Sequence, residues 1–247
     1  MHVRIVQAHP DPASFNAAMS RAAADALGGL GHTVSVQDLY ASRFDPVEKA
    51  EHYGNRLDAR SFAPLAEQRH AWQTGAVPAQ IGAEIAELER ADLLILQFPL
   101  WWHGPPAILK GWFDRVFVNS GLYTSRMRYD TGYFRERRAM VSVTTGAPES
   151  AFGAGARGGN FETMLWPIHY SLHYLGFEVL PPFQVCGVQG HGYAYEDQGM
   201  QEQRLRAALG DWAGHVTRAP ELPTLPFPGW DDWDADGQPI RRAEPIP

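Results

Sequence analysis

The chain has 247 residues, 45% of them hydrophobic, and its 21 basic and 28 acidic side chains give a net charge of −7. This length and composition allow a sizeable core in one large domain or two small ones. Nucleic-acid affinity comes from Lys and Arg clustered against phosphates. Because the sequence has no basic block, a nucleic-acid-binding protein is disfavoured.

The cysteine content and the first residues indicate where the protein resides. The single cysteine, Cys186, cannot form a disulfide within the chain, which is typical of the reducing cytosol. The opening MHVRIVQAHPDP is expected to be a strand and a loop, without the apolar stretch of a signal peptide. No apolar run approaches the roughly 20 residues that span a bilayer. We therefore expect a cytoplasmic protein without membrane insertion.

Short runs rich in Val, Ile and Leu alternate with helical patterns along the chain. The expected strands cover residues 3–8, 33–38, 92–98, 139–144 and 177–185. The expected helices cover residues 16–30, 80–90, 107–118, 161–175 and 201–216, and residues 40–78 are expected to be an irregular surface excursion. This alternation predicts a doubly wound parallel α/β sheet of five strands, with helices on both faces.

The C-terminal segment differs in composition from the rest of the chain. Residues 219–247 hold seven prolines, two Trp and alternating charges. Such composition is typical of a polar linker, whereas Trp230 and Trp233 favour a segment that packs on its own subunit or on a partner. Both alternatives stay open. Residues 1–218 are expected to form one catalytic domain, and residues 219–247 an irregular Pro-rich extension.

Three loops are candidates for a ligand site. In an open parallel sheet, ligands bind beyond the carboxyl ends of the strands. This rule selects residues 9–16, 99–106 and 144–159 before any motif is considered.

The first loop leads directly into a helix. Ser14 or Asn16 can cap that helix, and its free N–H groups and dipole suit a phosphate. The loop has neither a GxxxxGK[ST] motif nor a Gly-rich dinucleotide turn, so a phosphate held without Mg²⁺ is the better match. The alternative is an ordinary helix cap.

The second loop carries Trp101 and Trp102, followed by a glycine and two prolines. Flat aromatic side chains at the end of a strand suit a planar heteroaromatic ligand. The alternative is that both Trp side chains pack beneath the loop.

The third loop offers the hydroxyls of Thr144 and Thr145 and close backbone approach at Gly146. It also contains a literal GxGxxG at residues 153–158, but this begins several residues after the strand. Glu178, about 20 residues further on, begins a strand instead of ending one, so the dinucleotide fingerprint is rejected.

Two other features have ordinary structural explanations. His169 and His173 stand four apart on a predicted helix, as metal ligands can, but the surrounding aromatic residues favour a packing or interface face. No metal site is therefore expected. Cys186 is expected to lie in the core and not to act as a nucleophile.

Residues 91–117, ADLLILQFPLWWHGPPAILKGWFDRVF, resemble the NAD(P)H:quinone oxidoreductase family. Four shorter blocks do so in matching order and spacing, over roughly residues 3–215. They are His9 with residues 14–16, residues 123–124 with 129–132, residues 144–146, and residues 165–168.

The resemblance implies a flavodoxin-like fold with strand order 2-1-3-4-5, and a homodimer that binds FAD, with FMN as the alternative. It implies that four residues hold the phosphates and ribityl chain: His9, Ser14, Phe15 and Asn16. It implies that residues of the other two loops surround the isoalloxazine ring: Pro99, Leu100, Trp101, Trp102, His103, Thr144, Thr145, Gly146 and Ala147. Tyr123, from the other subunit, would cover the substrate site together with Ser125 and Trp102.

The catalytic loop departs from the family pattern. Animal members carry a Tyr and a His that help to stabilise negative charge on the reduced flavin, and Phe152 and Arg157 stand at those positions here. A second active-site Tyr of those members is Ser125 in this chain. Phe152 and Arg157 are the catalytic candidates, and the group that stabilises the charge on the reduced flavin is left open.

The implied activity is a two-electron hydride transfer from NAD(P)H, through flavin N5, to a quinone or similar acceptor in a ping-pong cycle. Either NADH or NADPH fits. The alternatives are a flavodoxin-type electron carrier and a regulatory flavoprotein subunit of a transport system. The aromatic second loop and Tyr123 favour an enclosed substrate pocket, and hence the enzyme.

Overall fold

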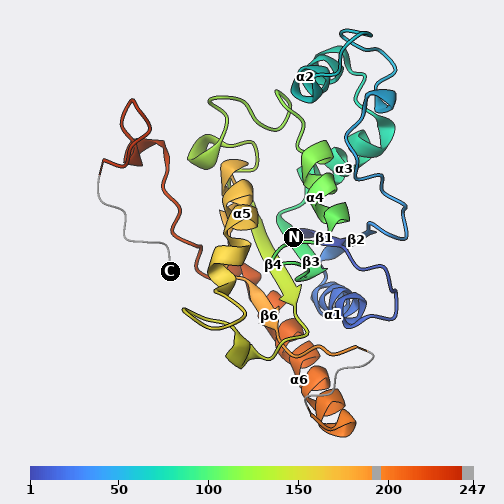
Figure 1. Ribbon diagram of the computed structural model, residues 1–247, viewed down its shortest axis with the longest axis vertical. Helices are drawn as coiled ribbons and strands as arrows, with labels where there is room; N and C mark the ends of the chain where they lie inside the picture. Colours follow the sequence, from blue (N-terminus) through green and yellow to red (C-terminus); the bar gives the residue numbers. More distant parts are fainter. Residues whose placement is uncertain (191–195, 241–247) are drawn as a thin grey trace.

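The computed structural model describes residues 1–190 and 196–240 and consists of a parallel sheet between two layers of helices (Figure 1). The strands are β1 (His2–Gln7), β2 (Thr33–Asp38), β3 (Leu93–Pro99), β4 (Arg138–Thr144), β5 (Glu178–Val179) and β6 (Phe183–Val185). They pair in the order β2-β1-β3-β4-β5, and β6 also pairs with β4. The predicted strand order is therefore confirmed.

The expected strand 177–185 is divided into two. Glu178 and Val179 of β5 pair with the start of β4, whereas β6 pairs with residues 142–144 at its end. Between them stand Pro181 and Pro182, which have no N–H to donate to a neighbouring strand. The sequence carried this signal, and the single strand predicted there is wrong.

The two faces of the sheet build two separate cores. Helices α1 (Phe15–Gly29) and α6 (Gln198–Val216) cover one face, and α3 (Ala79–Arg90), α4 (Ala107–Val116) and α5 (Phe161–Tyr174) cover the other. Side chains of β3 alternate between the cores, so Leu93 and Ile95 enter one, and Leu94 and Leu96 the other. Both faces are thus buried, as the apolar sequence of this strand predicts.

One helix was missed by the sequence analysis. Within the supposedly irregular residues 40–78, α2 runs from Pro64 to Thr74. Proline at its first turn and Gly75 beyond its end, at φ 68°, are ordinary start and stop signals. Gln68 of α2 accepts the Asn119 N–H at 3.0 Å and donates to the Asp114 carbonyl at 2.9 Å, which fastens α2 to the end of α4.

The described part of the C-terminal segment packs on its own subunit. It leaves α6 and lies beside α5 (Figure 1, red). Leu225 donates its N–H to the Val179 carbonyl at 2.7 Å, and His173 of α5 hydrogen-bonds the Pro228 carbonyl at 2.9 Å. The alternative of a solvated linker is therefore wrong for residues 225–233. Residues 241–247 of the predicted extension lie outside the described residues.

A buried chain of polar side chains fastens the start of α1 to the sheet. Gln97 of β3 donates to Asn16 Oδ1 at 2.9 Å, and Asn16 donates to the Thr144 hydroxyl at 2.9 Å. All three side chains are buried, so the Gln97–Asn16–Thr144 chain is shielded from water. It fixes the ends of α1, β3 and β4 relative to one another.

Replacing Asn16 by Ala is expected to destabilise the flavin-free protein by roughly 1–3 kcal/mol, because a buried donor on Gln97 and a buried acceptor on Thr144 lose their partners. Urea unfolding followed by circular dichroism measures the change. Asn55 is exposed, so Asn55→Ala is the matched control and should shift stability by less than about 0.5 kcal/mol. Equal effects of the two substitutions would contradict a stabilising role for this chain.

Candidate functional site

Three loops leave the sheet at the same edge, as the sequence rule predicts. The strand ends are joined by backbone hydrogen bonds, from Ala8 N–H to the Gln97 carbonyl at 2.9 Å and from Leu100 N–H to the Thr144 carbonyl at 2.7 Å. The loops that follow β1, β3 and β4 therefore begin side by side. They contain all the residues expected to hold the flavin.

The first loop presents the open N-terminus of α1. Ser14 caps the helix by accepting the Ala17 N–H at 3.2 Å, and the first turn contains no acidic residue. The positive end of the helix dipole is therefore not compensated by the protein and suits an anion. His9 is half-buried and its ring lies 6.1 Å from that of Trp101, which joins the first loop to the second. Phe15 packs partly on the core, and Asn16 faces the sheet.

The second loop is a tight turn with strained backbone. Trp101 and Gly104 exchange backbone hydrogen bonds of 2.9 and 3.1 Å, and Trp102 and His103 between them have φ 50° and 62°. A non-glycine residue in this left-handed region costs roughly 1–2 kcal/mol. Trp102 is nonetheless 96% exposed and Trp101 41% exposed. The alternative that both Trp side chains pack beneath the loop is wrong.

Such an arrangement is a mark of a functional surface. Strained residues persist where the surroundings hold them, and they gather at ligand sites. Here the strain presents a large indole to solvent with no packing gain from its own chain. Leu100, next to the turn, is half-buried against the core and anchors it.

The third loop supplies backbone groups and one unpaired cation. Thr145 is buried and accepts the Ala147 N–H at 3.1 Å, and Gly146 is exposed with its own N–H unpaired among the described residues. Further along, Phe152 packs on Phe161 with ring centroids 4.4 Å apart. Arg157 is exposed, and within residues 1–190 and 196–240 its guanidinium has no hydrogen bond or ion pair.

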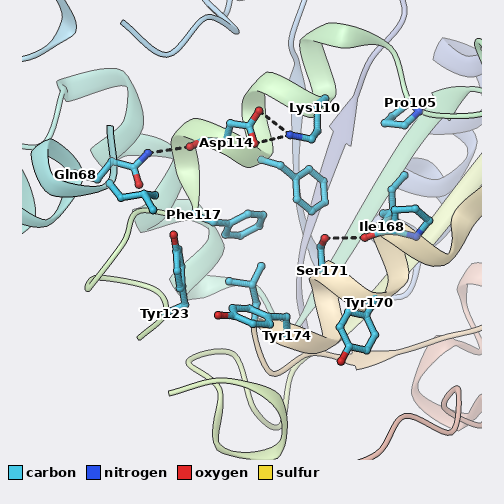
Figure 2. Close-up of a pocket in the computed structure, with 14 residues that line it drawn as sticks. Gln68, Pro105, Lys110, Asp114, Phe117, Tyr123, Ile168, Tyr170, Ser171 and Tyr174 are labelled. Atoms are coloured by element: carbon cyan, nitrogen blue, oxygen red, sulfur yellow. Dashed lines mark hydrogen bonds and ion pairs between the residues drawn. The ribbon is translucent and has the colours of Figure 1, made fainter. Parts of the chain in front are cut away.

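A cavity of about 700 Å³ lies between α2, α4 and α5 (Figure 2). Tyr123, Phe117 and Tyr174 form one side of it, and Pro105 from the end of the second loop lies at the far end in this view. None of the residues expected to hold the flavin lines this cavity. The sequence predicts an aromatic packing or interface face on the helix that carries Trp166, Tyr170 and Tyr174, and Tyr170 and Tyr174 of this helix line the same cavity as Tyr123. Burial and a hydrogen bond with Tyr129 raise the pKa of Tyr170 to about 12, so its phenol keeps its proton at neutral pH.

The remaining candidates from the sequence are structural in this fold. His173 stacks on Phe227 at 4.7 Å, and Trp166 stacks on Tyr170 at 4.5 Å. Burial lowers the pKa of His169 to about 4, which keeps it neutral. Burial raises the pKa of the Cys186 thiol to about 11, which disfavours the nucleophilic thiolate.

Comparison with known proteins agrees with this geometry. A family model described as a flavodoxin-like fold matches residues 1–209. The chain is 43% identical over 189 residues to NAD(P)H dehydrogenase (quinone) 1 of Cavia porcellus, covering 76% of this chain and 68% of that protein. It is 35% identical over 213 residues to ribosyldihydronicotinamide dehydrogenase (quinone) of Mus musculus, covering 85% and 88%.

A solved structure of a candidate quinone reductase from Klebsiella pneumoniae is also similar. It is 33% identical and superimposes with a TM-score of 0.83, covering 95% of this chain and 92% of that one. The resemblance seen in the sequence motifs is therefore confirmed. The chain belongs to the NAD(P)H:quinone oxidoreductase family of flavodoxin-like proteins.

Proposed function

We propose that this quinone oxidoreductase uses bound FAD to carry two electrons from NAD(P)H to a quinone or similar acceptor in a ping-pong cycle. Bound flavin would supply the two-electron hydride chemistry at N5, while the protein would bind and orient the reactants and supply charge. The observation that carries the proposal is the exposed, strained Trp102–His103 turn beside the open N-terminus of α1. The turn offers a surface for a planar ring, and the helix end offers N–H groups for phosphates.

The residues of the three loops fit this cofactor. Ser14 and His9 border the open end of α1, where phosphates would be held. The Gly146 N–H, which has no partner among residues 1–190 and 196–240, would be free to hydrogen-bond the flavin ring. The side chains of Thr144 and Asn16 hydrogen-bond each other, so they would support the flavin-binding loops from the side of the sheet.

The rival functions differ in turnover. A flavodoxin-type electron carrier or a regulatory flavoprotein subunit of a transport system would bind flavin but oxidise NAD(P)H poorly. Steady-state NADPH oxidation by the purified protein with a simple benzoquinone separates them from the enzyme. A cytoplasmic location belongs to the same proposal; in the described ranges no helix is both long enough and apolar enough to cross a bilayer.

The purified protein should be yellow and should release FAD when denatured. The motive is the set of three loops together with a chain longer than a minimal flavodoxin. Mass spectrometry of the released cofactor is the measurement. FMN as the sole product would place the protein on the short-chain branch, and a colourless protein that no flavin reconstitutes would refute a flavoenzyme.

The active site should be shared between two subunits. Tyr123 lines a cavity that holds none of the flavin-binding candidates of its own chain, while Trp102 and Trp166 are exposed. We therefore expect a homodimer in which Tyr123 covers the partner's flavin. Light scattering at assay concentration should give the dimer mass, and a catalytically competent monomer would refute it.

Co-expression of two inactive variants tests the sharing directly. A Tyr123→Ala subunit paired with a Trp102→Ala subunit has one site with both defects and one intact site. Random pairing makes half of all dimers mixed, and each mixed dimer has one intact site out of two. About one quarter of wild-type activity should therefore be restored. If each site used its own Tyr123, the mixed dimer would have no intact site and no activity would return.

Arg157 should stabilise the negative charge that arrives on the flavin with the hydride. The Phe152 side chain has no polar group and packs on Phe161. Arg157 lies on a loop at the same edge of the sheet as the other candidates, and its guanidinium has no partner in the part of the chain that the structure describes. Preorganised charge in a partly dry site is a large catalytic contribution. Three glycines with positive φ, at 153, 155 and 159, give the loop the freedom to bring the guanidinium inward.

Arg157→Ala should slow flavin reduction by NADPH by roughly 10- to 1,000-fold, the upper end being what loss of one oxyanion-type donor costs. Flavin affinity should change little, because the ring's other contacts remain. Stopped-flow absorbance measures the rate. Arg206 on α6 is highly exposed, and Arg206→Ala is the control for loss of one surface charge. An unchanged rate in Arg157→Ala would mean that backbone N–H groups near Gly146 stabilise the charge instead.

A further inference from the structure

The C-terminal strap, residues 225–233, ends in an aromatic cluster on the loop that follows Tyr123. Trp230 donates its indole N–H to the Arg128 carbonyl at 3.0 Å and to the Thr131 hydroxyl at 2.9 Å. Its backbone N–H donates to Asp130 at 3.0 Å. Trp230, a hundred residues further along the chain, thus hydrogen-bonds three residues of the segment 128–131.

Arg128 lies among three aromatic rings. Its guanidinium carbon is 5.1 Å from the centre of the Trp230 ring, 5.4 Å from that of Tyr174 and 5.5 Å from that of Tyr129. It also donates to the Tyr174 hydroxyl at 3.1 Å. Guanidinium groups stack well on aromatic faces. Because Arg128 contacts both rings, a displacement of Trp230 would also change the position of Tyr174.

Tyr129 adds a second link. Its φ of 57° is strained for a residue with a side chain, and such strain persists only where neighbours enforce it. The strap supplies two of these neighbours, because the Tyr129 ring lies 5.3 Å from Trp230 and 4.8 Å from Trp233. The ring also meets Tyr174 edge-on at 5.3 Å.

The cluster ends at the cavity. Tyr174 packs against Tyr123 with ring centroids 5.8 Å apart, and both side chains line the 700 Å³ space (Figure 2). We propose that the C-terminal strap is a specificity-determining part of the acceptor site, with Trp230 and Arg128 as positioning residues that hold the Tyr123–Tyr174 wall inward. The inference rests on the proposed function, since it takes this wall as the cover of the site where acceptors bind.

The test compares a one-ring benzoquinone with a three-ring sulfonated anthraquinone. With the strap released by Trp230→Ala, the wall moves outward, so the small acceptor loses a contact face while the large one gains room. The ratio of the two kcat/KM values should shift toward the larger acceptor by roughly tenfold, the lower end of what a misfitted pocket contact costs. Flavin content should match wild type.

Matched variants separate positioning from a loss of folded protein. Ile240→Ala changes an exposed apolar side chain beyond the cluster and should leave the ratio unchanged. Trp230→Phe keeps a ring over Arg128 but loses the indole N–H, so it should give a smaller shift and serves if the Ala variant folds poorly. Backbone amides of residues 124–131 should exchange hydrogen faster in both Trp230 variants.

The outcomes are distinct. A purely structural role would lower both kcat/KM values by the same factor, and that result, or an unchanged ratio, overturns the proposal. Quenching of protein fluorescence by the two quinones gives the ratio of their dissociation constants, which should shift in the same direction without turnover. If wild-type protein binds the quinones but does not oxidise NAD(P)H, the proposed function fails while the specificity role of the strap is still decided by binding.

Discussion

The site depends on keeping the ends of β1, β3 and β4 in fixed relation while the loops beyond them stay open to a ligand. Backbone pairing alone fixes the strands, but α1 must also be held so that its N-terminus faces the same edge. The buried Gln97–Asn16–Thr144 chain does this with two hydrogen bonds of 2.9 Å. Buried hydrogen bonds are directional, and apolar packing alone would not define the helix position so closely. Residues that resemble flavin ligands by sequence thus include one, Asn16, that faces the sheet.

The sheet and α1 hold the three loops in place, but the described residues leave the solvent-facing side of these loops exposed. The Trp102 side chain is almost fully exposed, and its left-handed backbone conformation is unfavourable for a residue with a side chain. Arg157 has no partner among the described residues. The cavity that contains Tyr123 lies beside this surface and does not include it. The exposed indole of Trp102 leaves a large apolar surface in water, which is unfavourable, whereas the exposed guanidinium of Arg157 is simply hydrated. A flavin and a second subunit closing over the loops would remove the indole from water, and this supports the proposed shared site.

The strands and most helices could be predicted because their signals are local. Apolar runs such as residues 92–98 and the turn residues that bound them need no knowledge of the rest of the chain. The split of the fifth strand and the start of α2 also have local signals, namely Pro181 and Pro64, which the sequence interpretation does not use. The Trp230 cluster is different, since its hydrogen bonds join residues about a hundred positions apart. No periodicity reveals such a contact, and two tryptophans in a proline-rich tail show only that the tail buries something.

Arg128 and Arg157 both lie near the candidate site, but their surroundings suit them to different roles. Arg128 is half-buried, with its guanidinium among three rings and one of its N–H groups donating to the Tyr174 hydroxyl, so its position is fixed by the wall that it supports. Arg157 differs: it is exposed, lies on a glycine-rich loop, and has no hydrogen bond or ion pair with the residues that the structure describes. Moving Arg128 toward a ligand would break contacts that support Tyr129 and Tyr174, whereas moving Arg157 breaks none in the described chain. The proposed charge stabilisation would require a donor that can move to the flavin, and on this physical ground the proposal assigns it to Arg157 and not to Arg128.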